Sequence, residues 1–177
     1  MGTPKDPKPV KLFAGLIFKE EALFQGALKM LEDKVGAIEQ KIPPAVFSHT
    51  DYYEEEMGKG LFRVFILFKE LFPRELLPGI KLKTNEIEAA FSESHRRSVN
   101  IDPGYISLEN VILATTKGFA HRIYMGSGIY ADLTLTYSNG TYRPLEWTYP
   151  DYGEAKTISV FNEWRENYKQ VLRCQKA

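Results

Sequence analysis

Hydrophobic and polar positions divide the chain into short segments of two kinds. The stretch 11–18, "KLFAGLIF", is a continuous apolar run, which is typical of a buried central strand. In 61–69 apolar residues recur at every second position, so this segment predicts another strand with Arg63 on the opposite face. In 21–36 apolar residues recur at helical spacing and Gly36 can end the helix.

The remaining segments follow the same two patterns. Strands are expected at 46–57, 110–116, 120–125 and 129–137, a short helix at 85–91 behind two chain-breaking prolines, and a closing helix with Ile158, Phe161, Trp164, Tyr168 and Val171 on one stripe. Short links between strands favour antiparallel pairing. The predicted fold is α+β, a largely antiparallel sheet with helices packed on it as a two-layer sandwich. Residues 1–10, rich in proline, predict a flexible arm, and 11–177 a single domain.

The stretch 121–137, "HRIYMGSGIYADLTLTY", contains enough residues on both sides of a turn to predict its own register. A three-residue loop at 126–128 places Tyr124 opposite Tyr130 and Arg122 opposite Asp132. In this register polar residues pair with polar residues, and apolar residues pair with apolar ones. The apolar side then holds Ile123, Met125, Ile129, Ala131 and Leu133, with His121 beside them, and the polar side holds Arg122, Tyr124, Tyr130, Asp132 and Thr134. The polar side is either a solvated surface or a working face.

Three further stretches admit both a structural and a functional interpretation. "NIDPGY" at 100–105 suits a type II turn, or presents Asn100 and Asp102 as acceptors at a strand end. "HTDYYEEEMG" from His49 contains Asp51 among carboxylates that could bind Mg²⁺, or forms a charged edge. "EWTYPDY" at 146–152 can stack a base or sugar, or pack over the end of the sheet.

Composition excludes several classes of protein. Acidic and basic residues balance at 23 each, so no net field favours nucleic acid or an anionic membrane. The single cysteine, Cys174, excludes an internal disulfide, and no apolar run is long enough to cross a membrane. The three histidines, 49, 95 and 121, lack ligand-like spacing, and phosphate-loop, dinucleotide and zinc-protease motifs are missing. The cytoplasm is the expected location.

Several motifs, in order, resemble a prokaryotic family of domains of unknown function, DUF4416. They are "PVKLFAGLIF", "TDYYEEEMG", "KLKTNEIE", "VNIDPGY", "VILATTKG", "HRIYMGSGIYADLTL" and "WTYPDY". The resemblance spans nearly the whole chain and implies one domain without a defined activity. Members are sometimes labelled GTP-binding proteins. This chain lacks the phosphate loop and any N-K-x-D motif, so we expect no GTP hydrolysis of that type.

Together these patterns predict a polar pocket for a small anionic ligand, a nucleotide or a phosphorylated metabolite. The ligand-binding candidates are Arg63, Arg97, Asn100, Arg122, Tyr124 and Tyr130, because guanidinium groups suit phosphate and carboxylate oxygens. The catalytic candidates are Asp51, Asp102 and Asp132, which could also bind a divalent cation in metal-assisted hydrolysis or group transfer. The alternative is a non-catalytic protein-interaction module with exposed tyrosines. The oligomeric state is not indicated.

Overall fold

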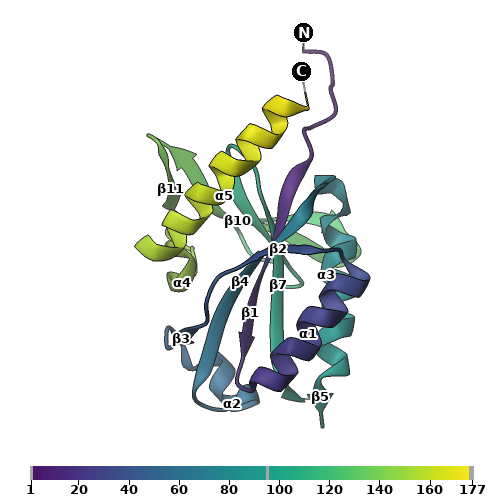
Figure 1. Ribbon diagram of the computed structural model, residues 1–177, viewed down its shortest axis with the longest axis vertical. Coiled ribbons are helices and arrows are strands. Elements are labelled where there is room, and N and C mark those ends of the chain that lie inside the picture. The colour runs from purple at the N-terminus through teal and green to yellow at the C-terminus, as the bar shows by residue number, and fades with distance from the viewer. Residues whose placement is uncertain (1, 95, 176–177) are drawn as a thin grey trace.

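A computed structural model describes residues 2–94 and 96–175 of the chain (Figure 1). Met1, His95 and residues 176–177 lie outside the described part. The expected lack of ligand-like spacing at His95, the start of the predicted arm and the end of the predicted domain therefore concern residues that are not described. Residues 2–9 carry no helix or strand and are mostly exposed.

Strands and helices alternate in the first half of the chain, and a run of strands followed by two helices forms the second half. The strands are β1 (Val10–Phe18), β2 (Ile38–Lys41), β3 (Ala45–Phe47), β4 (Leu61–Phe72), β5 (Ser92–Glu93), β6 (Arg96–Arg97), β7 (Val99–Ile106), β8 (Asn110–Thr115), β9 (Arg122–Gly126), β10 (Ile129–Ser138) and β11 (Thr141–Pro144). The helices are α1 (Glu21–Lys34), α2 (Glu54–Met57), α3 (Leu77–Ala90), α4 (Pro150–Gly153) and α5 (Ala155–Cys174), with short 3-10 turns η1 (Asp51–Tyr53) and η2 (Arg74–Leu76).

One large sheet organises the fold. Its strand order is β11-β10-β8-β7-β1-β4-β2, with β3 paired to β4 and β9 paired to β10, and the pairings are antiparallel. The continuous apolar run that forms β1 lies at the centre, with every residue buried. The predicted α+β class with a largely antiparallel sheet is confirmed.

Helices cover both faces of this sheet. Alternate β1 residues, Leu12, Ala14 and Leu16, belong to the same apolar cluster as α1 and α3. Phe13, on the opposite face of β1, contacts Phe161 of α5. Figure 1 shows α1 and α3 side by side and α5 across the other side of the sheet. The expected two-layer arrangement is therefore incomplete, because α5 adds a third layer.

The sheet is split between β7 and β8. These strands pair only over Gly104–Ile106 and Val111–Leu113. They approach so closely there that a Cβ on Gly104 would lie 2.4 Å from the Ile112 carbonyl oxygen. Beyond this point β8 leaves β7, and α3 takes its place beside Ile101. The Ile101 N–H donates to Glu88 Oε1 at 2.6 Å, and Lys81 Nζ donates to the Ile101 carbonyl at 2.8 Å. Two side chains thus satisfy backbone groups that a neighbouring strand would otherwise pair.

This split explains why "DPGY" is strand rather than turn, contrary to the sequence-based alternative. Pro103 lies two residues from Ile101, so its backbone nitrogen also points away from β1 toward the gap. A missing N–H there removes no bond to β1. Gly104 allows the close approach of β8. Pro103 and Gly104 are therefore explained by the divergence of β7 and β8 and not by a turn.

Two other element predictions are wrong. A single strand was expected at 46–57. The strand β3 covers only Ala45–Phe47, and residues 51–57 form η1 and α2 instead. The Thr50 side chain accepts a hydrogen bond from the Tyr52 N–H and so starts the turn. The helix expected at 85–91 begins at Leu77, because Pro78 lies in the first turn, where no intrahelical N–H is required.

The cross-strand pairs of the hairpin are confirmed, but its loop and one core assignment are not. Tyr124 pairs with Tyr130 and Arg122 with Asp132, as expected. The loop is shorter than the expected 126–128, because Ile129 pairs with Gly126 and a bulge follows it. On the apolar side Ile129 is buried, and Met125, Ala131 and Leu133 pack against the same core cluster, as assigned. Ile123, assigned to the core, is 74% exposed, whereas Asp132, assigned to the polar side, is buried. The loop before α4 covers that side, since Thr148 Oγ1 and Trp147 Nε1 donate to β10 carbonyls. In α5, Leu172 is buried in place of the predicted Val171.

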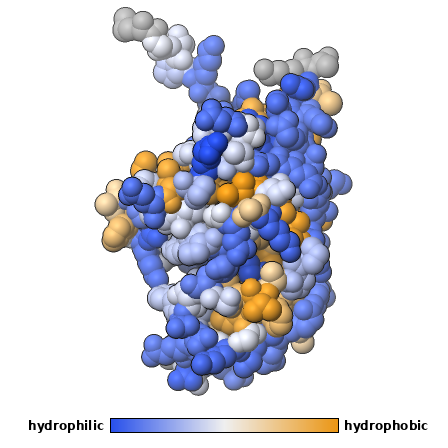
Figure 2. Space-filling model, turned by 90° about the vertical axis from the view of Figure 1, so that its left-hand side faces the viewer, coloured by the Kyte–Doolittle hydropathy of each residue, from blue (hydrophilic) through white to orange (hydrophobic). Residues whose placement is uncertain are grey.

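The surface that carries β3, α4 and β11 is mixed in character. Figure 2 shows hydrophilic residues over most of this side, with apolar residues emerging in separate patches. Within the described part of the chain, none of the helices combines the length and apolarity that a membrane span requires.

Candidate functional site

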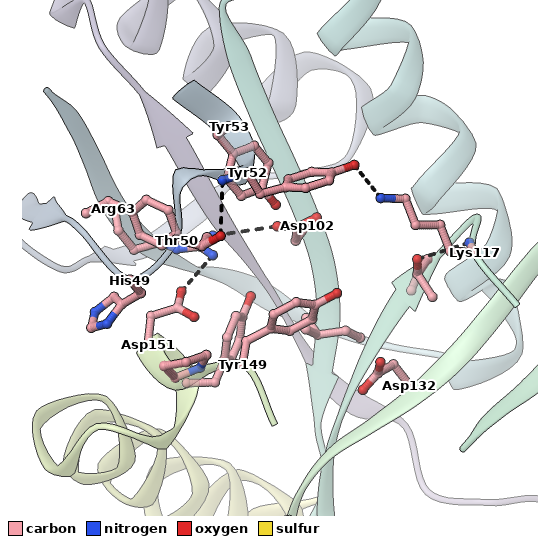
Figure 3. A pocket seen from close by; sticks show the side chains of 16 residues that line it. His49, Thr50, Tyr52, Tyr53, Arg63, Asp102, Lys117, Asp132, Tyr149 and Asp151 are labelled. Carbon is pink, nitrogen blue, oxygen red and sulfur yellow. Dashed lines mark hydrogen bonds and ion pairs between the residues drawn. The ribbon is translucent and has the colours of Figure 1, made fainter. Parts of the chain in front are cut away.

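A cavity of about 420 Å³ lies where β7 and β8 diverge (Figure 3). Its volume is in the range of small-molecule sites. Its lining comes from four parts of the chain: the β3–α2 region (Phe47, His49, Thr50, Tyr52, Tyr53), β4 (Arg63), β7 with β8 and the residues after it (Asp102, Leu113, Ala114, Thr115, Lys117), and β10 with the α4 region (Asp132, Tyr149, Pro150, Asp151, Tyr152).

Arg63 is the central cation of this cavity, and it is only 7% exposed. Its guanidinium lies 5.3–5.4 Å from the ring centres of Phe47, Phe65 and Tyr152. Nη2 is 2.7 Å from Asp151 Oδ2, whereas Nε and Nη1 have no hydrogen-bond partner among the described residues. Burial acts to lower the pKa of Arg63, but Tyr152, Asp151 and Asp102 together hold it above its ordinary value. Arg63 therefore stays charged, and its Nε and Nη1 groups have no hydrogen-bond acceptor in the described part of the chain.

Two tyrosines beside Arg63 remain protonated. Burial raises the pKa of Tyr53 well above its usual range, and nearby Asp102 adds to the effect. Burial likewise raises the pKa of Tyr152, whose hydroxyl has no hydrogen-bond partner among the described residues. Both phenols can therefore donate hydrogen bonds to a ligand, and neither can serve as a base near neutral pH.

The three aspartates of the cavity differ in their partners. Asp151 is paired with Arg63, and Asp132 with Arg122, whose Nε lies 2.8 Å from Asp132 Oδ2. Asp132 also contacts His121 Nε2 at 3.3 Å. The nearest cationic atoms to Asp102 are Arg63 Nη1 at 3.6 Å and Lys81 Nζ at 3.9 Å, beyond hydrogen-bond distance. Asp102 accepts a hydrogen bond from the Asn100 amide and is thus the cavity carboxylate without a close ion pair.

Lys117 and Tyr52 meet at the mouth of the cavity. Lys117 Nζ donates to the Tyr52 hydroxyl at 2.5 Å, and lies 4.5 Å from the centre of the Tyr52 ring. Figure 3 shows this contact joining the η1 side to the end of β8. Within residues 2–94 and 96–175, Lys117 has no carboxylate partner. It is therefore the cavity cation best able to accept a new anion.

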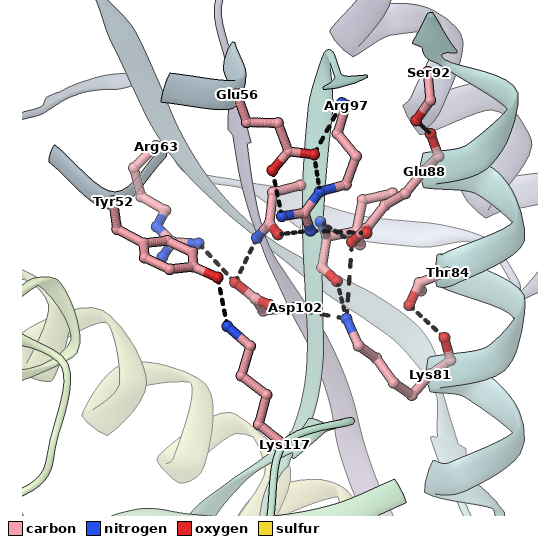
Figure 4. A network of polar contacts seen from close by, with 12 residues as sticks. Tyr52, Glu56, Arg63, Lys81, Thr84, Glu88, Ser92, Arg97, Asp102 and Lys117 are labelled. Atoms are coloured by element: carbon pink, nitrogen blue, oxygen red, sulfur yellow. Dashed lines mark hydrogen bonds and ion pairs between the residues drawn. The ribbon is translucent and has the colours of Figure 1, made fainter. Parts of the chain in front are cut away.

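Behind Asp102 a chain of charged side chains leads away from the cavity (Figure 4). The Asn100 amide donates to Asp102 Oδ2 at 2.8 Å and accepts from Arg97 Nη1 at 2.8 Å. Arg97 also donates to Glu56 through Nε and Nη2, a bidentate pair, and contacts Glu88 at 3.2 Å. Hydrogen bonds from Arg97 lower the pKa of Glu56. These groups fix the position of Asp102.

Glu88 gives this network a testable pH dependence. Burial raises its pKa, although Lys81 and the Ile101 N–H oppose the shift. Because the folded-state pKa lies above the unfolded one, the stabilising contribution is present below about pH 4.5 and is lost as pH rises through the folded pKa. We therefore expect the unfolding free energy of the wild type to fall relative to Glu88→Gln over that rise. Urea titrations of both proteins from pH 4 to 8 measure the difference; a constant difference would contradict the expectation.

The structure brings together some of the residues singled out in the sequence. Arg63, Asp102 and Asp132 line the cavity. Arg122 and Asn100 contact it indirectly, through Asp132 and Asp102. Arg97 lies farther along the network, and Asp51, Tyr124 and Tyr130 do not line the cavity; Tyr124 is 60% exposed and Asp51 is exposed. His121, expected among apolar residues, stacks on Trp147 and contacts Asp132.

Sequence reasoning missed Lys117 and the roles of Tyr52 and Tyr53. Their only signal is position: Lys117 follows directly after β8, and the tyrosines follow Thr50, which starts the turn. The sequence offers Tyr152 as a residue that could stack on a base or sugar and Asp151 as an acceptor of hydrogen bonds, and both line the cavity. In the described part of the chain, no group of three His, Cys, Asp or Glu side chains is arranged to hold a metal ion. The aspartates of the cavity are therefore spread around it rather than gathered.

Comparisons with known proteins identify a family but no curated or solved relative. A family model described as a domain of unknown function, DUF4416, matches residues 8–168. No curated protein and no solved structure gives a significant match to the chain.

Proposed function

Because this chain belongs to the DUF4416 family of domains of unknown function, we propose its function from the cavity itself. The protein binds a small anionic ligand there, a nucleotide or a phosphorylated metabolite. One observation carries the proposal: the guanidinium of Arg63, the ammonium of Lys117 and the protonated phenols of Tyr53 and Tyr152 belong to the lining of a single cavity of about 420 Å³. Guanidinium, ammonium and phenol groups are the hydrogen-bond donors that suit anionic oxygens.

The distribution of charge in the cavity supports a position at its mouth for the anionic group of the ligand. Arg63 is flanked by Asp151 and Asp102, so its surroundings are already supplied with negative charge. Lys117 has only the Tyr52 hydroxyl and ring as partners in the described part. An ammonium group attracts phosphate or carboxylate strongly when no nearby carboxylate competes. The rings of Tyr149 and Tyr152, which also line the cavity, can contact a flat or apolar part of the ligand.

Asp102 is the candidate acid or base in any reaction of that ligand. It faces the cavity, and Asn100 orients it by a hydrogen bond at 2.8 Å. Asp132 and Asp151 are held in short ion pairs and suit structural or positioning roles better. Metal-assisted hydrolysis or group transfer would require ligand oxygens to complete the coordination of a divalent cation, since the carboxylates do not converge.

A thermal-shift screen of nucleotides, sugar phosphates and divalent ions tests the proposal. A ligand present at 100 times its Kd adds about 2.7 kcal/mol to the unfolding free energy. For a chain of this size that corresponds to a rise of roughly 5–10 °C in Tm. If no member of the panel shifts the melting temperature at millimolar concentration, the proposed class of ligand is wrong.

Lys117→Ala separates the mouth of the cavity from the scaffold. We expect the variant to lose at least tenfold in affinity for an anionic hit from the screen, because the cation without a carboxylate partner is removed. Stability should change by less than about 0.5 kcal/mol, since Lys117 is exposed. Lys59→Ala is the matched control, as Lys59 is also exposed and lies outside the cavity. Isothermal titration of the three proteins measures their affinities, and urea denaturation measures their stabilities. Equal affinities would remove Lys117 from the site.

A second candidate function is a non-catalytic protein-interaction module. Phe119, Ile123 and Tyr124 are 60–74% exposed, and the last two lie on β9, which is paired with β10 alone. Exposed apolar and aromatic residues of this kind are enriched in protein interfaces. If this candidate is correct, Ile123→Asp with Tyr124→Asp would abolish binding of a partner protein and leave ligand shifts unchanged.

A further inference from the structure

Asp102 presents an accessible carboxylate to the cavity. Its side chain is 26% exposed, and the residue belongs to the cavity lining. Oδ2 accepts a hydrogen bond from the Asn100 amide at 2.8 Å. The oxygen of that amide accepts from Arg97 Nη1 at 2.8 Å, so the amide is held with its nitrogen toward Asp102. In the described part of the chain Oδ1 of Asp102 accepts no hydrogen bond, because Lys81 Nζ lies 3.9 Å away. The carboxylate is therefore fixed in position with Oδ1 able to accept.

Tyr53 brings a hydroxyl toward this carboxylate from η1. Its ring packs against Phe47, with the ring centres 5.9 Å apart, and against the apolar cluster that contains Met57 and Leu61. The residue is half-buried and lines the cavity, and Figure 3 shows its hydroxyl end directed toward Asp102. Among the described residues this hydroxyl has no hydrogen-bond partner, and burial keeps it protonated. It therefore presents a hydrogen to the cavity beside the free oxygen of Asp102.

The charges around Asp102 decide which kind of ligand group suits this position. Arg63 Nη1 lies 3.6 Å from Asp102, and Lys81 Nζ lies 3.9 Å from it. Each of these cations also has a second carboxylate, Asp151 at 2.7 Å from Arg63 and Glu88 at 3.8 Å from Lys81. Positive and negative groups thus alternate, and an added charge of either sign would meet a like charge nearby. An uncharged group avoids this repulsion.

A hydroxyl is the uncharged group that matches both protein groups with one atom. Asp102 Oδ1 requires a donor, whereas the Tyr53 hydroxyl requires an acceptor. A hydroxyl oxygen donates one hydrogen bond and accepts another, but an amide N–H only donates and a carbonyl oxygen only accepts. Water can occupy the same position, and a ligand hydroxyl that replaces it keeps both hydrogen bonds. The exposed rings of Tyr52 and Tyr149, also in the lining, can pack against the carbon skeleton that carries the hydroxyl.

We propose that Asp102 and Tyr53 bind a hydroxyl group of the ligand, which donates to the Asp102 carboxylate and accepts from the Tyr53 hydroxyl. The ligand is then a hydroxylated compound with an anionic group near Lys117, either a sugar phosphate or a nucleotide bound through its ribose. This inference rests on the proposed function and narrows its ligand class. Asp102 and Tyr53 become specificity-determining residues, which discriminate a hydroxylated ligand from its deoxy analogue.

Matched pairs of probes test this assignment and separate its two sources. Ribose 5-phosphate and tetrahydrofurfuryl phosphate share a ring and a phosphate, but the second lacks every ring hydroxyl. AMP and 2′,3′-dideoxy-AMP differ in the same way and retain the base. By isothermal titration we expect the hydroxylated member of at least one pair to bind about tenfold or more tightly, the usual effect of a hydrogen bond to a charged group. The pair that responds identifies the source as a free sugar phosphate or a nucleotide.

Two variants assign that preference to the named residues. Asp102→Ala removes the acceptor and should bring the ratio of affinities within the responding pair to near one. Tyr53→Phe removes the donor and should lower the ratio at least about threefold. Its Tm without ligand should not change, because the Tyr53 hydroxyl has no partner in the described part of the chain. Tyr53→Phe therefore decides the matter if Asp102→Ala does not fold.

Tyr52→Phe is the matched control for Tyr53→Phe. Tyr52 is the neighbouring residue and also lines the cavity, but its hydroxyl accepts from Lys117 at the mouth. Loss of this hydroxyl should change the affinity of both members of a pair alike and leave their ratio intact. A ratio that falls equally in Tyr52→Phe and Tyr53→Phe would place the ligand hydroxyl at the mouth and overturn the assignment.

Each other outcome counts against a defined part of the argument. Equal binding of hydroxylated and deoxy members overturns the hydroxyl assignment and leaves the anionic-ligand proposal standing. Failure of both pairs, when another anion of the screen does bind, also overturns the hydroxyl assignment. If no anion binds, the proposed function fails with it. A preference that persists in both Asp102→Ala and Tyr53→Phe removes these residues from recognition.

Discussion

Arg63→Met is expected to lower the unfolding free energy by about 3–5 kcal/mol, the usual cost of removing one partner of a buried ion pair. Asp151 is 5% exposed and would be left without its cation, and Asp102 would lose the nearer of its two. For a chain of this size the loss corresponds to a fall of roughly 10 °C in Tm. Urea denaturation at neutral pH measures the change directly.

Two controls make the Arg63 experiment specific. Adding Asp151→Asn to Arg63→Met should recover part of the lost stability, because an amide costs less to bury unpaired than a carboxylate does. Lys59→Met, at an exposed lysine, should change stability by less than about 0.5 kcal/mol. A loss below 1 kcal/mol for Arg63→Met alone would mean that water replaces the guanidinium without cost.

Arg122→Ala should lower the unfolding free energy by about 3 kcal/mol, because Asp132 is at least as buried as Asp151 and is left with weaker partners. Those partners are the His121 ring at 3.3 Å and the Thr134 hydroxyl at 3.2 Å. This expectation differs from that for a solvated strand pair, which would contribute well under 1 kcal/mol. Chemical denaturation of the wild type and the variant decides between them.

Arg143→Ala is a close control for Arg122. Arg143 lies on β11, beside the same strand β10, but its side chain is exposed and has no carboxylate partner among the described residues. It should change stability by less than about 0.5 kcal/mol. If both arginine variants behave alike, Asp132 does not depend on Arg122. If the ligand-induced rise in Tm persists in Arg122→Ala, Arg122 contributes to stability and not to ligand binding.

Local pairing was predictable from the sequence, whereas coverage by distant segments was not. The 122–132 register follows from residues within one hairpin, because a shift by one residue would place unlike side chains together. Which face of that hairpin is buried depends on Trp147 and Thr148, whose contacts with β10 no local pattern encodes. For this reason the sequence predicts Asp132 as the partner of Arg122 but does not predict that Asp132 is buried.

The candidate site shows the same limit. Alternation along β4 placed Arg63 opposite the apolar face, and the structure confirms that position. Asp102 was noticed, but Pro103 and Gly104 suggested a turn, because turn chemistry and the divergence of two strands require the same residues. Lys117 joins the cavity only because β8 leaves β7, and Asp151 only because α4 packs against Arg63. Both depend on contacts between distant parts of the chain.

The central position of β1 also governs when the cavity can form during folding. Gly15 must pair with Phe65 and with Asp102, residues far from it along the chain, before Arg63 and Asp102 can meet above it. Tyr152 arrives from still later in the sequence. Such long-range pairing has a high contact order and forms slowly compared with α1 or α3. A chain that has formed its helices but has not yet paired β7 with β1 therefore lacks the cavity. A ligand of the cavity cannot accelerate helix formation or early collapse. It acts instead by slowing the unfolding of the completed sheet.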